Sequence, residues 1–401
     1  MPNLIERPNY LQQLIAFKDT QIIKIVTGIR RCGKSTLFDL YCEDLRRIGV
    51  KDSQIIRINL EDPDFGEIDD WKKLYGLIKD KLAADKMNYI FIDEVQNVPD
   101  FQKAVDGLFI KPNCDVYITG SNAYLLSGEL ATLLSGRYVE IKMLPLSFKE
   151  YVSAFPAPTD LLFKYRDYIQ NGSFPYVLDL QRKQDIRAYL ESIYTAVVLK
   201  DVVARKRISD VALLENVISY MFDNIGNLCS STKIANTLTS AGRKISAHTV
   251  DSYLSALTDS FILYRAKRYD VKGRQLLVTG SKYYLADIGL RYYLLGSKRA
   301  DTGHILENVV YLELLRRGYE VYVGKVDKVE VDFIAINEEG EEYYQVAQTV
   351  QDADGSILAR ELAPLQAIHD HNPKFLLTMD VEPVISHNGI KQINVLDWLL
   401  K

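Results

Sequence analysis

The sequence predicts an α/β protein whose first domain is built on a doubly wound parallel sheet, and two observations support this fold class. Ile22, Ile23, Ile25 and Val26 are β-branched and predict a buried strand, and apolar residues at helical spacing begin at Leu37. Between them lies a segment that matches the phosphate-binding pattern G-x-x-x-x-G-K-[ST], namely Gly28-Ile29-Arg30-Arg31-Cys32-Gly33-Lys34-Ser35. A strand, this loop and a helix in that order predict a P-loop NTPase.

The loop residues predict how a nucleotide binds. Two glycines allow the backbone to curl, so that its amides and the next helix N-terminus point at phosphate groups. Lys34 is expected to reach the β- and γ-phosphates, and Ser35 to ligate Mg²⁺. The predicted nucleotide-binding residues are Gly28, Ile29, Arg30, Arg31, Cys32, Gly33, Lys34, Ser35 and Thr36. The alternative, a surface turn with an incidental lysine, does not explain the strand and helix on either side.

A second acidic motif follows a buried strand further along the chain. Residues 89–92 are continuously apolar, and Asp93 and Glu94 come directly after them. An extra strand, at 54–60, is predicted between the two motifs. Asp93 is expected to hold Mg²⁺, and Glu94 to orient or deprotonate the attacking water. The alternative is a solvated strand end with two incidental acids.

Two more strand ends carry candidate catalytic residues. Strand 115–119 leads to Ser121 and Asn122, which predict either a sensor of the γ-phosphate or a helix cap. Arg137 precedes strand 138–143, at the position from which AAA-type ATPases send an arginine finger into a neighbouring subunit. The alternative is a local ion pair between Arg137 and a carboxylate. The finger role implies a homo-oligomer, and the absence of an N-K-x-D segment favours ATP over GTP.

These motifs together resemble a family of bacterial and archaeal AAA-type P-loop ATPases whose C-terminal region has a poorly known role. The segments that carry the resemblance are 28–35, 89–94, 119–122, 133–137 and 145–148. The resemblance covers nearly the whole chain. It implies that Gly172-Ser173-Phe174-Pro175-Tyr176-Val177 belongs to a helical lid after the core.

Length and composition bound the remaining possibilities. The chain has 401 residues, 47% hydrophobic and 25% charged, with a net charge of −4, as expected for a soluble protein of several domains. We expect an ATPase core at 1–155, a lid at 156–208, a winged helix-turn-helix at 209–300 and a nuclease-like domain at 301–401. Neither a signal peptide nor a membrane span is predicted, which indicates a cytoplasmic protein. The four cysteines are too scattered to predict a zinc site or disulfides.

The middle of the chain predicts a winged helix-turn-helix. Helical patterns at 213–222, 231–238 and 246–257 precede strands at 261–269 and 276–279. Between Arg243 and Arg291 there are nine Lys or Arg residues against four Asp. This local excess of positive charge favours DNA contact, and a protein-docking role is the alternative. The candidate DNA-binding residues are Arg243, Lys244, His248, Arg268, Lys272 and Arg274.

The last hundred residues predict a restriction-endonuclease-like fold that has lost its active site. Glu307 on a helix and Asp332 on a hairpin occupy two positions of the nuclease constellation. The next strand carries Gln345 and Ala347 in place of the acid and the lysine. We therefore expect a degenerate site at Glu307, Asp332 and Gln345, with cleavage disfavoured.

The sequence thus predicts an ATP- and Mg²⁺-dependent AAA-type hydrolase. Its ATP turnover is expected to drive the binding or remodelling of DNA, branched DNA included. The alternative is a nucleotide switch that acts on a protein partner through the winged helix. An ATP-gated nuclease is a third and weaker hypothesis.

Overall fold

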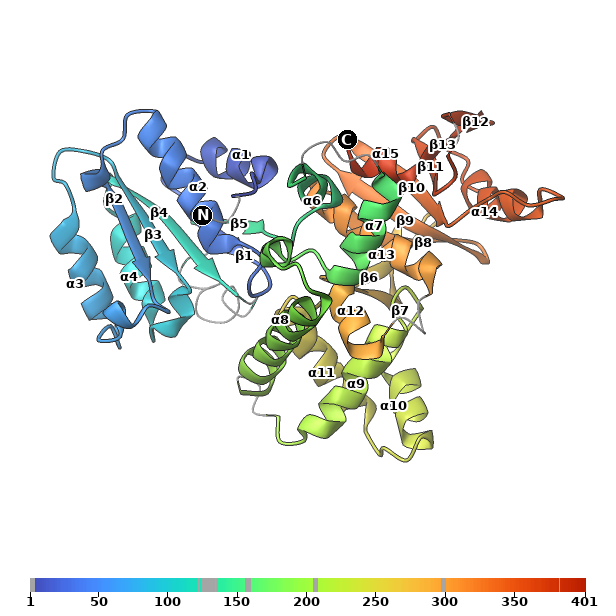
Figure 1. The fold of residues 1–401 in the computed structure, drawn as a ribbon, viewed down its shortest axis with the longest axis horizontal. Helices are drawn as coiled ribbons and strands as arrows, with labels where there is room; N and C mark the ends of the chain where they lie inside the picture. Colours follow the sequence, from blue (N-terminus) through green and yellow to red (C-terminus); the bar gives the residue numbers. More distant parts are fainter. Residues whose placement is uncertain are drawn as a thin grey trace. The chain divides into compact units, whose positions relative to one another are not determined.

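The computed structural model describes residues 4–121, 123, 134, 136–155, 160–204, 208–296, 301–381 and 383–401. The chain divides into two compact units, one formed by residues 1–145 and 259–261, the other by 146–258 and 262–401. Each contains one β-sheet (Figure 1). No helix of the described residues is long and apolar enough to cross a membrane.

The sheet of the first unit is parallel and has the strand order β2-β3-β4-β1-β5. Its strands are β1 (Ile23–Thr27), β2 (Ile55–Asn59), β3 (Asn88–Asp93), β4 (Cys114–Gly120) and β5 (Tyr138–Lys142). Strand β2 comes between β1 and β3 in the chain, as expected from the sequence. The predicted fold class is therefore confirmed.

Helices cover both faces of this sheet because side chains alternate along each strand. Ile90 and Ile92 of β3 belong to the core under α3 (Trp71–Lys81) and α4 (Phe101–Phe109). Phe91 faces the other way and lies against α2 (Lys34–Arg47), where its ring is 5.1 Å from that of Phe38. A further helix, α1 (Pro8–Ala16), packs beside α2 (Figure 1).

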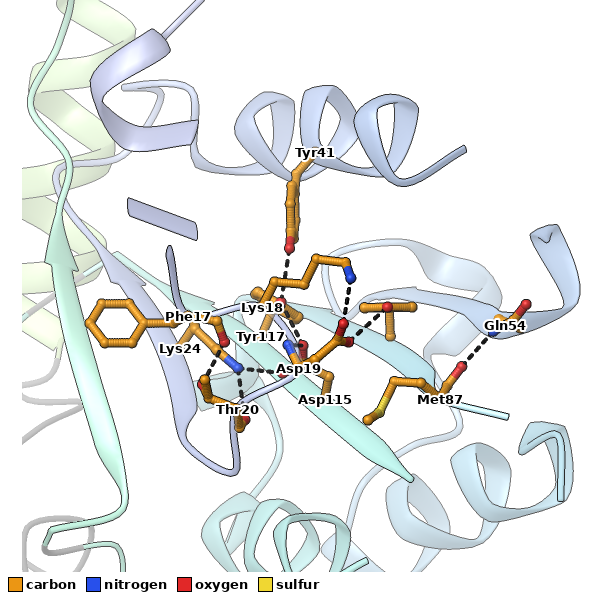
Figure 2. A network of polar contacts seen from close by, with 11 residues as sticks. Phe17, Lys18, Asp19, Thr20, Lys24, Tyr41, Gln54, Met87, Asp115 and Tyr117 are labelled. Atoms are coloured by element: carbon orange, nitrogen blue, oxygen red, sulfur yellow. Dashed lines mark hydrogen bonds and ion pairs between the residues drawn. The ribbon is translucent and has the colours of Figure 1, made fainter. Parts of the chain in front are cut away.

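A buried polar network fixes the amino ends of β1 and β4 (Figure 2). Lys24 forms an ion pair with Asp115 and donates to the backbone oxygen of Thr20 at 3.1 Å. The other carboxylate oxygen of Asp115 accepts from the Tyr117 hydroxyl at 2.8 Å and from the Asp19 amide at 2.9 Å. Lys24 and Asp115 are 0% and 1% exposed. The pair is thus completely enclosed.

The second unit begins with helices. These are α6 (Phe148–Ser153), α7 (Leu161–Asn171), α8 (Lys183–Thr195), α9 (Val211–Asp223), α10 (Ser231–Ser240) and α11 (Ala247–Asp259). A π-helical segment (Ala196–Ala204) continues α8. The last three helices precede a β-hairpin, in the order that the sequence predicts for a winged helix-turn-helix.

That hairpin is part of a mixed sheet of the order β12-β13-β11-β10-β9-β8-β6-β7. The strands are β6 (Leu263–Asp270), β7 (Gln275–Leu285), β8 (Glu320–Val326), β9 (Val329–Asn337), β10 (Gly340–Ala347), β11 (Lys374–Thr378), β12 (Ile385–His387) and β13 (Ile390–Asn394). Because β6 pairs with β8, the hairpin continues the C-terminal sheet instead of standing free as a wing. The expected boundary between 300 and 301 therefore falls inside one compact unit.

Helices lie on both faces of the mixed sheet as well. Tyr311 of α13 (Thr302–Arg316) stacks on Tyr284 of β7 with ring centroids 4.2 Å apart. Leu362 and Leu365 of α14 (Ser356–Gln366) pack with Ile334 in a separate core on the opposite face. The chain ends in α15 (Val395–Leu399).

The predicted lid segment docks on α12 (Ile288–Leu295) through a buried aspartate. Asp287 accepts hydrogen bonds from the backbone amide of Ser173 at 2.5 Å and from its hydroxyl at 2.6 Å. A β-carbon on Gly289 would lie 2.5 Å from Cα of Gly172, so the two backbones cross without room for a side chain. This close crossing explains why glycine occupies position 172.

Candidate functional site

The P-loop adopts a conformation that its glycines permit. Gly28 and Gly33 have φ values of 152° and 105°, and Gly33 caps the start of α2. A β-carbon on Gly28 would lie 2.1 Å from the backbone oxygen of Met143, so a side chain there would displace main chain. The predicted nucleotide-binding residues thus surround the β1–α2 junction, where helix amides can bind phosphate.

Lys34 is the first residue of α2 and folds back across the loop. Its Nζ donates to the backbone oxygens of Gly28 at 3.0 Å and Ile29 at 3.3 Å. The same Nζ lies 3.5 Å from Oε1 of Glu94. An incoming phosphate would compete for this ammonium group, which connects the loop with the acidic end of β3.

Asp93 and Glu94 are both buried at the carboxyl end of β3. Thr119 of β4 positions them both: its hydroxyl donates to Oδ1 of Asp93 at 3.0 Å and accepts from the Glu94 amide at 2.9 Å. Glu94 has a φ of 51°, a left-handed conformation that is costly for glutamate and is found at functional sites. Sequence reasoning included Thr119 in a motif but gave it no role.

A cation that sequence reasoning missed lies beside Asp93. Arg57 NH1 is 3.0 Å from Oδ2 of Asp93, although the two atoms are not aligned as a hydrogen bond. Arg57 NH2 donates to Asp39 of α2 at 2.7 Å. The available signal was a charged residue between Ile56 and Ile58 in an otherwise apolar strand.

The two acids have opposite pKa shifts. Burial raises the pKa of Asp93, and the nearby Arg57 only partly offsets this. Burial also acts to raise the pKa of Glu94, but Lys34 and the amide of Gln96 outweigh it and hold the pKa below its ordinary value. Glu94 is therefore a carboxylate at neutral pH, which is the form that a general base requires.

The side chains at this edge of the sheet fit a Mg²⁺ ion. Oδ2 of Asp93 is buried and accepts no aligned hydrogen bond, so a metal ion could take the place of the Arg57 guanidinium that now lies 3.0 Å away. Ser35 offers a hydroxyl in the first turn of α2. Carboxylate and hydroxyl oxygens are ligands that Mg²⁺ prefers, and the ion would neutralise charge on the β- and γ-phosphates.

The predicted sensor position is only partly described. Asn122 lies outside the described residues. Ser121 is buried, and its hydroxyl oxygen lies 3.5 Å from Nε2 of Gln96, which also donates to Glu94. Gln96 therefore links the end of β4 to Glu94, a role that sequence reasoning did not assign.

Arg137 makes a local ion pair, as the alternative interpretation of this residue predicts. It forms an ion pair with Asp106 of α4, and its guanidinium carbon lies 5.4 Å above the Phe109 ring. Its side chain is nevertheless 44% exposed. Solvent screens such a pair, so it leaves the arginine free to exchange partners.

Three predicted DNA contacts lie on the surface at the turn between α10 and α11 and at the start of α11. Arg243 and Lys244 are exposed in the turn between α10 and α11, and His248 is exposed in the first turn of α11. The rest of the exposed face of α11 carries little positive charge, with Asp251 bonded to Ser231. The cations at this motif are therefore concentrated in its turn.

The hairpin presents its predicted contacts unequally. Arg274 is exposed, whereas Arg268 is only partly exposed. Nζ of Lys272 lies 2.6 Å from Asp327. Two of the nine basic residues in this part of the chain, Lys282 and Arg291, are buried and contribute nothing to a surface patch. The basic surface is thus smaller than the sequence indicates.

The degenerate nuclease-like site contains a lysine after all. Lys282 of β7 lies 2.8 Å from Glu307, 2.8 Å from Glu330 and 3.8 Å from Asp332. Burial would lower the pKa of this ammonium, but the three carboxylates raise it. The expectation that the site lacks a lysine was therefore wrong, because the cation comes from a strand of the hairpin and not from β10.

This cluster does not fit a divalent metal ion. Lys282 already occupies the space between Glu307 and Asp332, and the amide of Gln345 donates to Glu361 at 3.0 Å. No group of three or more His, Cys, Asp or Glu among the described residues is arranged to hold a metal. Glu307, Asp332 and Gln345 are thus brought together in a closed polar cluster.

Comparison with known proteins identifies the two parts of the chain separately. Residues 20–152 match a family described as an AAA domain, and residues 162–301 match a domain of unknown function. An uncharacterised protein of Haemophilus influenzae is 42% identical over 404 residues, covering 99% of both chains. An uncharacterised protein of Methanocaldococcus jannaschii is 30% identical over 345 residues, covering 80% of this chain and 73% of its own.

Solved structures are similar at lower identity. A Walker-type ATPase of Pyrococcus abyssi matches with a TM-score of 0.48 and 16% identity, over 72% of this chain and 95% of its own. The ORC1 protein of Aeropyrum pernix, solved in complex with DNA, matches with a TM-score of 0.34 and 15% identity, over 73% of this chain and 92% of its own.

Proposed function

This chain belongs to a family of AAA-type P-loop ATPases, and on that premise we propose that it binds ATP with Mg²⁺ and hydrolyses it at the carboxyl edge of its parallel sheet. The distance of 3.5 Å between Lys34 and Glu94 carries this proposal, because it joins the phosphate-binding lysine to the acid at the end of β3. When phosphate groups bind Lys34, the contact between Lys34 and Glu94 is broken. The freed carboxylate then takes the proton of the attacking water.

Two substitutions test the assignment of roles. Lys34→Ala should abolish ATP binding, whereas Glu94→Gln should bind ATP and slow turnover by about 10²- to 10⁴-fold, the range for loss of a general base. Lys79→Ala, at an exposed lysine of α3, is the matched control. Binding is measured by titration calorimetry and turnover by phosphate release. Hydrolysis at the native rate by Glu94→Gln would show that Glu94 is not the base.

We further propose that ATP turnover is coupled to DNA binding through the turn of the helix-turn-helix. Arg243, Lys244 and His248 are exposed together there, and such a cluster binds phosphate backbones. Turnover should therefore rise with duplex or branched DNA, and less so as salt increases, because phosphate binding releases counterions. The double substitution Arg243→Ala with Lys244→Ala should remove the stimulation, and Lys183→Ala should not.

The alternative proposal is a nucleotide switch that acts on a protein partner. Helix α11 carries the exposed Asp251 and no lysine or arginine, and the hairpin is part of the C-terminal sheet; both observations favour this alternative. Under this proposal ATP turnover is indifferent to single-stranded, duplex and branched DNA at every salt concentration. The same titration series therefore separates the two.

A further inference from the structure

A buried arginine joins the P-loop to the segment through which the chain leaves the first unit. Arg7 immediately precedes α1 and is 3% exposed. Its NH1 donates to the backbone oxygen of Cys32, inside the P-loop, at 3.1 Å. Its NH2 donates to the backbone oxygens of Leu144 at 2.7 Å and Pro145 at 3.5 Å. One guanidinium thus contacts two segments that are more than a hundred residues apart.

The second of these segments lies at the boundary between the compact units, which falls between Pro145 and Leu146. It is also held against the start of the P-loop. The Met143 amide donates to the backbone oxygen of Thr27 at 2.7 Å, and the Met143 oxygen occupies the space where a side chain at Gly28 would lie. Residues 143–145 are called here the exit segment. They contact the beginning of the P-loop directly, and Arg7 connects them to Cys32 near the end of the loop.

Helix α1 supports the same connection. The guanidinium carbon of Arg7 lies 4.9 Å from the centre of the Tyr10 ring. The hydroxyl oxygen of Tyr10 accepts a hydrogen bond from the Leu144 amide at 3.1 Å. An arginine donates from separate nitrogen atoms of a rigid planar fork and can hold carbonyl groups of two segments at set positions, whereas a lysine donates from one nitrogen at the end of a flexible stem. Because the carbonyl oxygen of Cys32 faces Arg7, the backbone amides of the loop can face a phosphate.

We propose that Arg7 is a positioning residue that transmits the conformation of the P-loop to the exit segment, so that nucleotide binding is detected at the junction between the two units. The proposal rests on the proposed nucleotide binding at Lys34. A bound phosphate draws the loop amides inward and shifts the Cys32 carbonyl. Arg7 then carries this shift to the carbonyl groups of Leu144 and Pro145.

Hydrogen–deuterium exchange of the full chain with and without the non-hydrolysable analogue AMPPNP tests this coupling. In the wild type, the analogue should slow exchange both in the P-loop and at the amides of Met143 and Leu144. In Arg7→Gln the P-loop should still respond while the exit segment no longer does. Affinity for the analogue should fall about tenfold, as expected for losing a charged hydrogen bond.

Two further variants keep the test decisive. Arg7→Lys preserves the charge and should bind the analogue yet show a reduced response of the exit segment, even if Arg7→Gln fails to fold. Arg47→Gln, at an exposed arginine of α2, should behave as the wild type. A full response of the exit segment in Arg7→Lys and Arg7→Gln would overturn the coupling role alone. A wild type that binds no nucleotide would instead overturn the proposed function, and this inference with it.

Discussion

The parallel sheet carries a buried lysine–carboxylate pair at each end, and the two pairs differ in how completely they are satisfied. At the amino end, Lys24 and Asp115 are in contact, and Asp115 receives two more hydrogen bonds, from Tyr117 and Asp19. At the carboxyl end, Lys34 stands 3.5 Å from Glu94. One end is closed and the other is open.

This difference assigns the two ends different tasks. A buried charge whose lone pairs and protons are all engaged has nothing left to bind, so it can only fix the fold. A buried oxygen that faces a cation without an aligned hydrogen bond, such as Oδ2 of Asp93 beside Arg57, can exchange that partner for a ligand. This difference supports the proposal that nucleotide binds at the open end.

Breaking the closed pair should have the largest effect on stability. Lys24→Met leaves Asp115 buried without its cation, which costs about 3–5 kcal/mol in the free energy of unfolding. Because burial already raises the pKa of Asp115, loss of Lys24 raises it further. The variant should then gain stability as the pH falls, since the folded state takes up a proton more readily than the unfolded state.

Denaturant unfolding at several pH values measures both effects. The double variant Lys24→Met with Asp115→Asn should recover part of the loss, because no buried charge remains. Equal stability of Lys24→Met and the wild type at neutral pH would show that the closed network does not stabilise the sheet.

The cluster around Lys282 extends the comparison to the second unit, since three acidic side chains there surround one ammonium group. Burial and the charge of Glu307 raise the pKa of Asp332 to about 8. The folded state therefore keeps a proton that the unfolded state has lost above its ordinary pKa, and stability falls as the pH rises between these two values. Asp332→Asn should remove about 3.5 kcal/mol of this decline between about pH 5 and pH 8, at about 1.4 kcal/mol per pH unit.

The test compares how steeply the free energy of unfolding changes with pH in the wild type and in Asp332→Asn. Asp327→Asn, at an exposed aspartate of the β8–β9 turn, is the control and should keep the native slope. Parallel curves for Asp332→Asn and the wild type would mean that Asp332 is ionised throughout.

The open pair should matter much less for folding. Lys34→Met removes an ammonium that donates to two backbone oxygens, but its contact with Glu94, at 3.5 Å, is longer than that of Lys24 with Asp115. We expect a loss of about 1 kcal/mol, the range for an ordinary hydrogen bond. Thermal unfolding without nucleotide checks this, and a loss as large as that of Lys24→Met would remove the distinction between the ends.

The residues proposed for the open end could be found in the sequence because they lie in local motifs. The P-loop residues follow one another, and Asp93 and Glu94 end a recognisable strand. Arg57, Thr119 and Arg7 were missed because each acts through a contact across strands or between distant segments. For the same reason Lys282 could not be assigned: its strand was expected to end at 279, and the pairing of β6 with β8 is set by tertiary contacts.

Arg137 should have the smallest effect on stability and therefore gives the cleanest test of assembly. Its pair with Asp106 is exposed, so Arg137→Ala should cost at most about 0.5 kcal/mol. If Arg137 instead completes the site of a neighbouring subunit, Arg137→Ala should lose ATP turnover while it keeps ATP binding. Mixing it with Lys34→Ala should then restore turnover, because one subunit supplies an intact P-loop and the other an intact arginine. Absence of any restored phosphate release in the mixture would assign Arg137 to its local pair with Asp106 alone.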